Sequence, residues 1–139
     1  MRLLNINGKL TNKNVSKFRI KWNGKSASKI QFKTKQFLEK YWENHIVYEE
    51  FPVYGTRLRV DIINFTKKIA IEVNGGQHYH FNKFFHANSR INYLNSIKRD
   101  WQKTEWLEMN NLKLIELIES DIKNLSLDFI EDKFEILIV

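Results

Sequence analysis

Residues 59–80 read RVDIINFTKKIAIEVNGGQHYH and carry the clearest structural and chemical signals in the chain. Two runs rich in β-branched residues flank a polar turn at residues 66–68, which predicts a hairpin of two short strands at 58–65 and 69–73. Each strand carries one interior carboxylate, Asp61 in the first and Glu72 in the second. A carboxylate inside an apolar strand is costly to bury unless it is paired, hydrogen-bonded or bound to a metal. Two such acids with a histidine shortly after them favour a hard-cation site for phosphodiester chemistry.

Hydrophobic spacing on either side of the hairpin predicts the other elements. Helical periodicity indicates helices at 28–43, where Ser28 is the candidate cap, and at 89–109, where Trp101 and Trp106 are expected to pack on the sheet. A third helix is expected from residues 120–121 onward. Apolar runs predict strands at 45–51 and 112–117, and more weakly at 3–6 and 18–22. This order predicts an α/β fold with a mixed central β-sheet flanked by α-helices.

Composition favours one packed globular domain. The chain has 139 residues, of which 42% are hydrophobic and 14% aromatic, enough for a sizeable core. No cysteine is present, so disulfides and thiolate metal sites are excluded. No apolar run reaches the roughly 18–20 residues of a membrane span, and no apolar signal core follows Met1. We therefore expect a cytoplasmic protein with no membrane partner.

Positive charge is concentrated at the N-terminus. Residues 1–40 hold eleven Lys or Arg and one acid, whereas residues 41–139 hold twelve basic and fifteen acidic side chains. Such asymmetry is typical of a polyanion-binding surface, although a solubilising tail would have the same composition. We treat 1–28 as a basic segment and 29–139 as the main domain. The candidate nucleic-acid-binding residues are Lys17, Arg19, Lys21, Lys25, Lys29, His80 and Lys83.

Three motifs together resemble one branch of the PD-(D/E)xK nuclease superfamily, the branch of the very-short-patch-repair endonucleases and the EDxHD homing endonucleases. Residues 71–78, IEVNGGQH, are similar to its ExDGxxH signature. Asp100, Lys103 and Leu107 match its Dxx(K/R)xxxL helix, and Asp61 falls in a strand like its metal-binding strand. The resemblance covers roughly residues 30–120, with the motifs in the family's order. It implies a restriction-endonuclease-like core and a nuclease domain at 29–139.

The resemblance also implies a mechanism. The chain would cleave double-stranded DNA with Mg²⁺, which Mn²⁺ can replace, and would leave 5′-phosphate ends. Asp61 and Glu72 would bind the metal together with the backbone carbonyl of Val73, because Mg²⁺ takes oxygen ligands. His78 would act as general base or acid, its ordinary pKa being near neutrality. Gln77 and Asp100 would complete the catalytic set.

The sequence departs from the family pattern in two places. The lysine expected two residues after Glu72 is Asn74, so the cationic role would fall to Gln77, His78 or a distant lysine such as Lys103. The glutamate expected in the first helix falls near Lys35 or Gln36, with Glu39 one turn later as a possible substitute. Because of these departures, two further interpretations stay open: altered metal binding, and an enzyme that has lost its activity.

Each candidate residue also has a structural interpretation. Asp61 could pair with a neighbouring arginine, and Asp100 could form a surface pair with Lys103. His80 could face DNA or serve the fold. Three functions therefore stand as hypotheses: a phage or mobile-element homing-type or repair-type DNA endonuclease in a bacterial host cytoplasm, a non-catalytic DNA-binding module on a decayed nuclease scaffold, and a structure-specific or RNA-directed nuclease. The sequence does not decide between a monomer and a homodimer.

Overall fold

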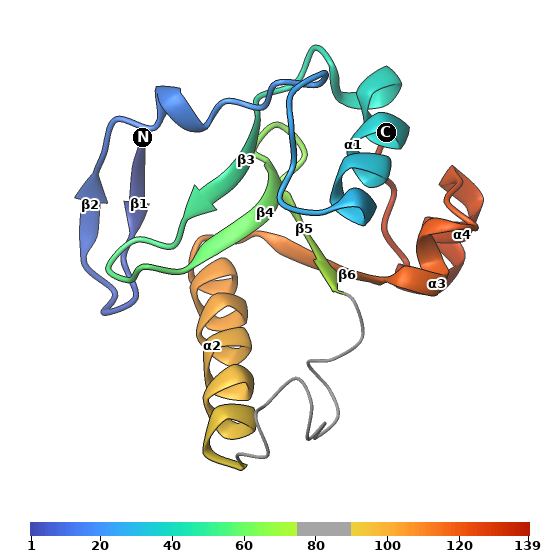
Figure 1. Cartoon of the computed structure of the whole chain (residues 1–139). Coiled ribbons are helices and arrows are strands. Elements are labelled where there is room, and N and C mark those ends of the chain that lie inside the picture. The colour runs from blue at the N-terminus through green and yellow to red at the C-terminus, as the bar shows by residue number, and fades with distance from the viewer. Residues whose placement is uncertain (75–89) are drawn as a thin grey trace.

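The computed structural model of the chain describes residues 1–74 and 90–139, apart from the side chains of residues 92 and 93. Its centre is a four-stranded sheet in the order β3-β4-β5-β6 (Figure 1). The strands are β3 (Val47–Pro52), β4 (Arg59–Asn64), β5 (Ile69–Asn74) and β6 (Lys113–Ile118). The first three run antiparallel in sequence order, and β6 runs parallel to β5. The predicted mixed α/β architecture and the β4–β5 hairpin are confirmed.

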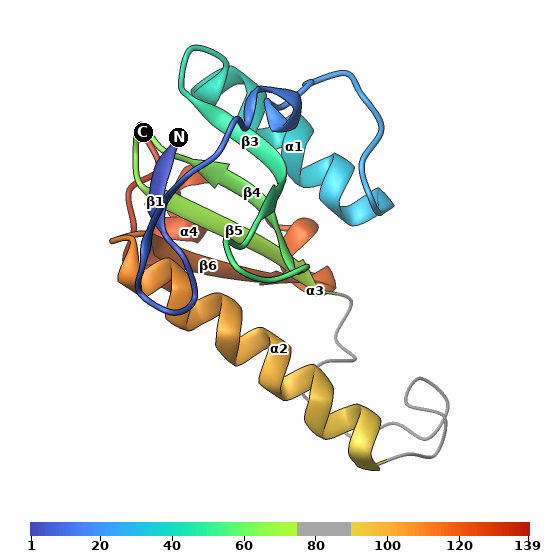
Figure 2. The ribbon, with the colours of Figure 1, turned by 90° about the vertical axis from the view of Figure 1, so that its left-hand side faces the viewer.

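Side chains that alternate along the strands build two separate cores, one on each face of the sheet. Ile63 of β4 and Ala70 of β5 point to the face covered by α2 (Arg90–Met109) and the N-terminal hairpin. Ile62 and Ile71 point to the opposite face, where α1 (Lys29–Trp42), α3 (Glu119–Ile122) and α4 (Leu127–Phe134) lie (Figure 2). Since one residue step reverses the face, Glu72, which follows Ile71, belongs to the α2 face, where Lys103 contacts it.

Helix α1 begins where the sequence predicted. The Ser28 hydroxyl oxygen accepts a hydrogen bond from the Gln31 N–H at 3.2 Å, which satisfies a free donor of the first turn. At the other end, Trp42 is fully buried and its indole N–H donates to the Ile138 carbonyl at 2.8 Å. The helix is therefore fixed to the sheet along its length and to the C-terminal segment.

Helix α2 is anchored at its C-terminal end and projects from the body at its N-terminal end (Figures 1 and 2). Trp106 is fully buried, as predicted, and its indole N–H donates to the Leu4 carbonyl at 2.7 Å. The prediction that Trp101 also packs on the sheet is wrong, because this side chain is 64% exposed on the projecting part of the helix. None of the described helices has the length and apolar character that a membrane span requires.

The two ends of the chain differ most from the sequence prediction. Strands β1 (Arg2–Leu4) and β2 (Leu10–Asn12) form a separate antiparallel hairpin. The prediction of a strand at 18–22 is wrong. A 3-10 helix (Ser16–Phe18) ends at the start of this range, and Arg19 forms only an isolated bridge to Tyr48. The final helix is divided into α3 and α4, because Ser126 starts a new helix by accepting from the Phe129 N–H.

Candidate active site

Acidic residues form a row across the sheet at one level. The β3–β4 pairs on either side of Glu50 place it level with Asp61, and extension of the β4–β5 register by one residue places Asp61 level with Glu72. In the parallel β5–β6 pair, Glu72 lies directly opposite Glu116. Asp61 and Glu72 were predicted from the sequence, whereas Glu50 and Glu116 were missed. All four strands of the sheet thus contribute one acid to this level.

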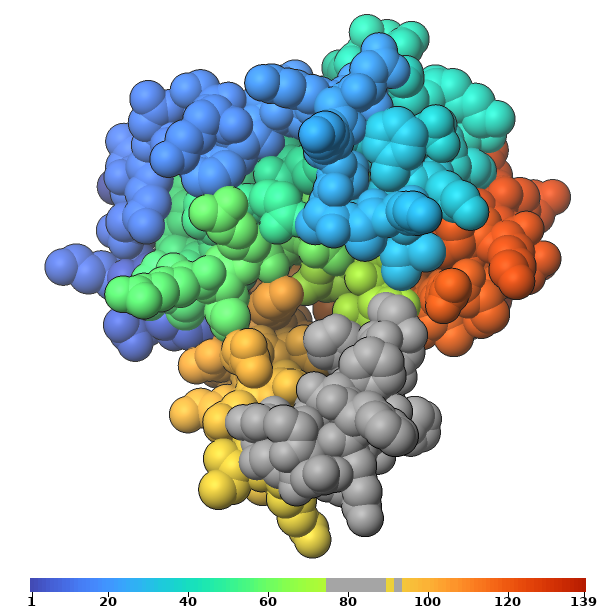
Figure 3. Space-filling model, in the orientation of Figure 1, coloured from blue at the N-terminus to red at the C-terminus, as the bar shows by residue number. Residues whose placement is uncertain are grey.

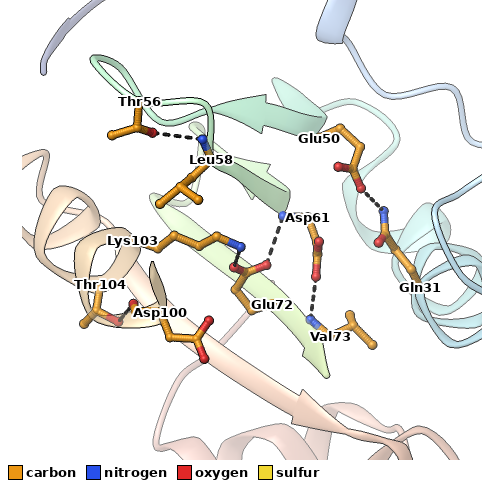
Figure 4. A network of polar contacts seen from close by, with 10 residues as sticks. All are labelled: Gln31, Glu50, Thr56, Leu58, Asp61, Glu72, Val73, Asp100, Lys103 and Thr104. Carbon is orange, nitrogen blue, oxygen red and sulfur yellow. Dashed lines mark hydrogen bonds and ion pairs between the residues drawn. The ribbon is translucent and has the colours of Figure 1, made fainter. Parts of the chain in front are cut away.

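Asp61 and Glu72 lie where β4 and β5 separate. Ladder pairing between these strands ends at Ile62 and Ile71, while β3–β4 and β5–β6 remain paired further along. We call this opening the strand fork. Across it, the Asp61 N–H donates to Glu72 Oε2 at 3.2 Å, and the Val73 N–H donates to Asp61 Oδ2 at 2.8 Å (Figure 4). Side-chain oxygens thus replace the missing ladder acceptors and hold both carboxylates at the base of the fork.

The two carboxylates repel each other in a poorly solvated place. Burial and the adjacent Glu72 charge raise the pKa of Asp61 to about 8, against a lowering contribution from the Val73 N–H and from Lys103. Asp61 is therefore mostly protonated at neutral pH in the metal-free protein. A divalent cation would remove this repulsion, because it attracts both carboxylates in their charged form.

Lys103 supplies the cation of the site. Its Nζ lies 2.7 Å from Glu72 Oε1, which makes it the partner of the second carboxylate. Burial alone would lower the pKa of Lys103, but Glu72, Asp61 and Asp100 together outweigh it and raise the pKa. Lys103 consequently stays protonated, one turn of α2 after Asp100. Lys103 was one of the predicted substitutes for the missing motif lysine, and its ammonium group lies in contact with Glu72; the catalytic role stays a prediction.

Asp100 lies beside the same pair, on the α2 side (Figure 4). It lines a small polar depression that also contains Glu72, Asn74, Lys103, Thr104 and Glu116. The structure therefore brings together three of the predicted catalytic acids, Asp61, Glu72 and Asp100. Gln77 and His78 fall outside the described residues, as do His80 and Lys83 of the predicted DNA-binding set.

The oxygen donors at the fork suit a hard cation. In a β-strand the N–H and carbonyl of one residue point to the same side, so the Val73 carbonyl points towards β4, as its N–H does. Two carboxylates and a carbonyl are the ligand types that Mg²⁺ takes from proteins, with waters completing its shell. Among residues 1–74 and 90–139, no three acidic or histidine side chains are grouped closely enough to form a metal shell by themselves. Asp61, Glu72 and Val73 thus fit Mg²⁺ as a partial ligand set.

The first helix contributes an amide instead of an acid. Gln31 of α1 is buried, and its Nε2 donates to Glu49 Oε2 at 2.8 Å and to Glu50 Oε1 at 3.2 Å. Lys35, one of the two residues at the expected glutamate position, is fully buried and lies 2.9 Å from Glu49 Oε1. Glu50 has a left-handed backbone with φ 53°, a conformation that costs a non-glycine residue about 1–2 kcal/mol. It turns its carboxylate towards α1 at the edge of the site (Figure 4).

Of the basic residues predicted to contact DNA, those that the structure describes lie on the surface. Lys17, Lys21, Lys25 and Lys29 are exposed, and so is Arg19, whose Nη2 donates to the His45 carbonyl at 3.1 Å. Lys25 and Lys29 line a shallow cavity of about 670 Å³ at the start of α1. Their contact with DNA stays a prediction.

Comparison with known proteins finds a similarity to a viral protein. Over 66 residues the chain is 39% identical to the uncharacterized protein 033L of Invertebrate iridescent virus 3. The match covers 48% of this chain but only 34% of the viral protein, so the chain corresponds to about a third of that relative's length. No protein-family model and no solved structure matches the chain.

Proposed function

We propose that the chain is a metal-dependent endonuclease that hydrolyses phosphodiester bonds in double-stranded DNA, with Mg²⁺ as cofactor and Mn²⁺ as a substitute. The observation that carries the proposal is the carboxylate pair at the strand fork, with Lys103 in contact with it. In such a pair, ionisation of the second carboxylate is unfavourable unless a positive charge lies beside it. A divalent cation is the ligand that this arrangement fits best.

The residues at the fork divide the work. Asp61, Glu72 and the Val73 carbonyl would hold Mg²⁺, which when bound stabilises negative charge on a phosphate and lowers the pKa of a bound water. Lys103 holds Glu72 in place and supplies a positive charge to the phosphate that is attacked. Asp100, whose charge acts on Lys103, would orient a water or balance the charge of that lysine. The sequence resemblance assigns proton transfer to His78, which follows β5 by four residues.

Cleavage of a supercoiled plasmid with Mg²⁺ or Mn²⁺ tests the proposal. The wild type should relax or linearise the plasmid, and EDTA should stop the reaction. Asp61→Asn, Glu72→Gln and His78→Ala should each lower the rate at least about a hundredfold, because metal binding and proton transfer each contribute that much. Glu131→Gln, which removes an exposed carboxylate from α4, is the matched control and should cleave like the wild type.

Failure of the plasmid assay would favour a second function, a DNA-binding module on a nuclease scaffold that has lost activity. Two observations support this alternative: Gln31 stands where α1 faces the acids, and Asn74 occupies the expected lysine position. In that case DNA binding persists in EDTA and in Asp61→Asn. Single-stranded, branched and RNA substrates in the same assay distinguish a structure-specific or RNA-directed nuclease.

The biological setting follows the same proposal. A compact nuclease domain of this kind suits a homing-type or repair-type enzyme of a phage or other mobile element, acting in the cytoplasm of its host. The similarity to a protein of a virus is compatible with such a setting. A single strand fork nicks one strand at a time, so a double-strand cut requires two copies of the chain or two successive nicks.

A further inference from the structure

A second concave site adjoins the strand fork on the α2 side. It is a cavity of about 270 Å³ between the segment that leads into β4 and one face of α2. Figure 3 shows this side of the molecule, where the green chain that contains β4 lies directly above the orange chain of α2. Its described lining consists of Arg57, Leu58, Arg59, Ser96, Arg99, Asp100 and Lys103. We call it the arginine cleft.

The arginine cleft concentrates positive charge. Among its described lining residues are three guanidinium groups and one ammonium group, against a single carboxylate, that of Asp100. The ammonium, that of Lys103, is already in contact with Glu72, whereas the three arginine side chains are exposed to solvent. Like charges held together repel each other, so this convergence favours the binding of an anion.

The two walls of the cleft orient these cations. Ser96, Arg99, Asp100 and Lys103 recur at helical spacing, so they share the face of α2 that meets the β4 segment. Arg99 Nε donates to the Asn95 carbonyl at 3.4 Å, within the helix. On the other wall, the Arg59 guanidinium lies 5.8 Å from the centre of the Phe18 ring, a cation–π contact that limits its movement.

The size of the cleft suits a phosphate group. Its volume is several times the roughly 30 Å³ occupied by one water in the liquid, so a phosphodiester fits with part of its hydration shell. Guanidinium groups match phosphate oxygens in paired hydrogen bonds, which a lysine does not reproduce. Asp100 and Lys103 belong both to this cleft and to the depression beside Glu72. An anion in the cleft would therefore be a close neighbour of a phosphate at the fork.

We propose that the arginine cleft binds a backbone phosphate of the DNA strand that is cleaved. This phosphate would neighbour the phosphodiester that lies at the strand fork. The proposal rests on the nuclease function for its choice of ligand, but binding in the cleft requires no metal and no cleavage. Arg57, Arg59 and Arg99 would then set the position of the strand relative to Asp61 and Glu72. Lys17, Lys21, Lys25 and Lys29 would add weaker contacts further along the duplex.

The test is binding of a labelled DNA duplex in EDTA, measured by fluorescence anisotropy at several salt concentrations. The triple variant Arg57→Gln, Arg59→Gln, Arg99→Gln should bind about tenfold or more weakly near 0.1 M salt. Its log–log salt slope should fall by about 0.9 for each phosphate that the variant no longer neutralises. The matched control is Lys9→Gln, Lys113→Gln, Lys123→Gln, which removes three exposed positive charges outside the cleft. It should retain the wild-type slope.

Replacing the three arginines by lysine separates charge from geometry. The lysine variant should keep most of the slope and bind with lower affinity, because its ammonium groups cannot form the paired hydrogen bonds. Equal reductions in the glutamine variant and the control, or a wild type that does not bind the duplex, would overturn the proposal. If the wild type binds the duplex in EDTA but does not cleave DNA with any metal, the proposed nuclease function is overturned instead. If the wild type cleaves DNA but its affinity for the duplex does not change in the glutamine variant, only the proposal for the cleft is overturned.

Discussion

At the scale of single residues, the strand fork gives its two central carboxylates unequal partners. Glu72 receives hydrogen bonds from the Lys103 ammonium and the Asp61 N–H, whereas Asp61 receives one from the Val73 N–H. Burial and the Glu72 charge act on Asp61 together and raise its pKa. The metal-free site therefore carries a proton that a bound cation must displace.

This proton makes stability depend on pH. The pKa of Asp61 is about 8 in the folded chain against 3.8 when unfolded, so between these values the folded state holds a proton that the unfolded state has lost. Asp61 thus favours the unfolded state increasingly as pH rises from about 4 to about 8, each pKa unit being worth about 1.4 kcal/mol. Asp61→Asn removes this dependence while its amide oxygen can still accept from Val73.

The measurement is urea unfolding in EDTA at pH 5, 7 and 9, for the wild type and Asp61→Asn. We expect the variant to gain stability relative to the wild type at each step upward, by at least about 1 kcal/mol between pH 5 and pH 9. Parallel pH profiles for the two proteins would show that Asp61 titrates normally, and the metal would then have no proton to displace.

The sequence could identify some of these acids and not others. Asp61 and Glu72 were predictable because each interrupts a run of apolar strand residues. Glu116 carries the same signal, within KLIELI, but its position beside Glu72 depends on the β5–β6 register, which the sequence does not reveal. Glu50 depends on the β3–β4 register and on a left-handed backbone at a residue type that rarely adopts it.

At the scale of elements, a buried ion pair joins α1 to β3. Lys35 of α1 is fully buried between Glu49 Oε1 and the Gly24 carbonyl, both at 2.9 Å from its Nζ. Glu49 also accepts from Ser26 and Gln31, so one carboxylate connects the helix, the preceding loop and the strand. Because Glu50 follows directly, this pair also fixes the edge of the acidic row.

Lys35→Met should therefore destabilise the fold strongly. Removal of one partner of a buried ion pair leaves the other charge without compensation and costs about 3 kcal/mol or more. Lys33→Met is the matched control, because Lys33 belongs to the same helix but is exposed. Thermal unfolding should show a drop of roughly 10 °C for Lys35→Met and little change for Lys33→Met. Similar melting of the two variants would mean that the pair adds no stability.

The elements with strong periodicity were the predictable ones. Helices α1 and α2 and strands β3 to β6 follow from apolar spacing, since their apolar residues form the two cores on either face of the sheet. The split between α3 and α4 depends on a local competition, in which the Ser126 cap interrupts a helix that the apolar pattern would continue. Trp101 was misjudged because the sequence does not tell how far a helix extends beyond the sheet that it packs on.

At the scale of the whole molecule, α2 connects the two proposed sites. Its buried end is held by Trp106 and Leu107 in the core, and its middle presents Asp100 and Lys103 to both the strand fork and the arginine cleft. A ligand at the fork therefore binds to β4, β5 and the contacts of α2 together. Such a ligand binds only the folded chain, because Asp61, Glu72 and Lys103 are held together only when the β4–β5 hairpin and α2 are folded.

Mg²⁺ should accordingly raise the melting temperature of the wild type. A ligand that binds only the folded state stabilises it by about 2.7 kcal/mol when its concentration is a hundred times its dissociation constant. The shift should be larger at pH 8.5 than at pH 6, because at the lower pH the Asp61 proton competes with the metal. Asp61→Asn should abolish most of it, since the amide supplies one neutral oxygen in place of a carboxylate.

Sodium chloride at matched ionic strength is the control, because screening alone alters the stability of a chain with a net charge of +7. If Mg²⁺ and sodium chloride shift the wild type equally, or if Asp61→Asn responds as the wild type does, the fork does not bind the cation. A shift specific to Mg²⁺ without plasmid cleavage would instead describe a site that retains its metal after losing its chemistry. Thermal shift and cleavage together thus separate binding of the metal from its use in catalysis.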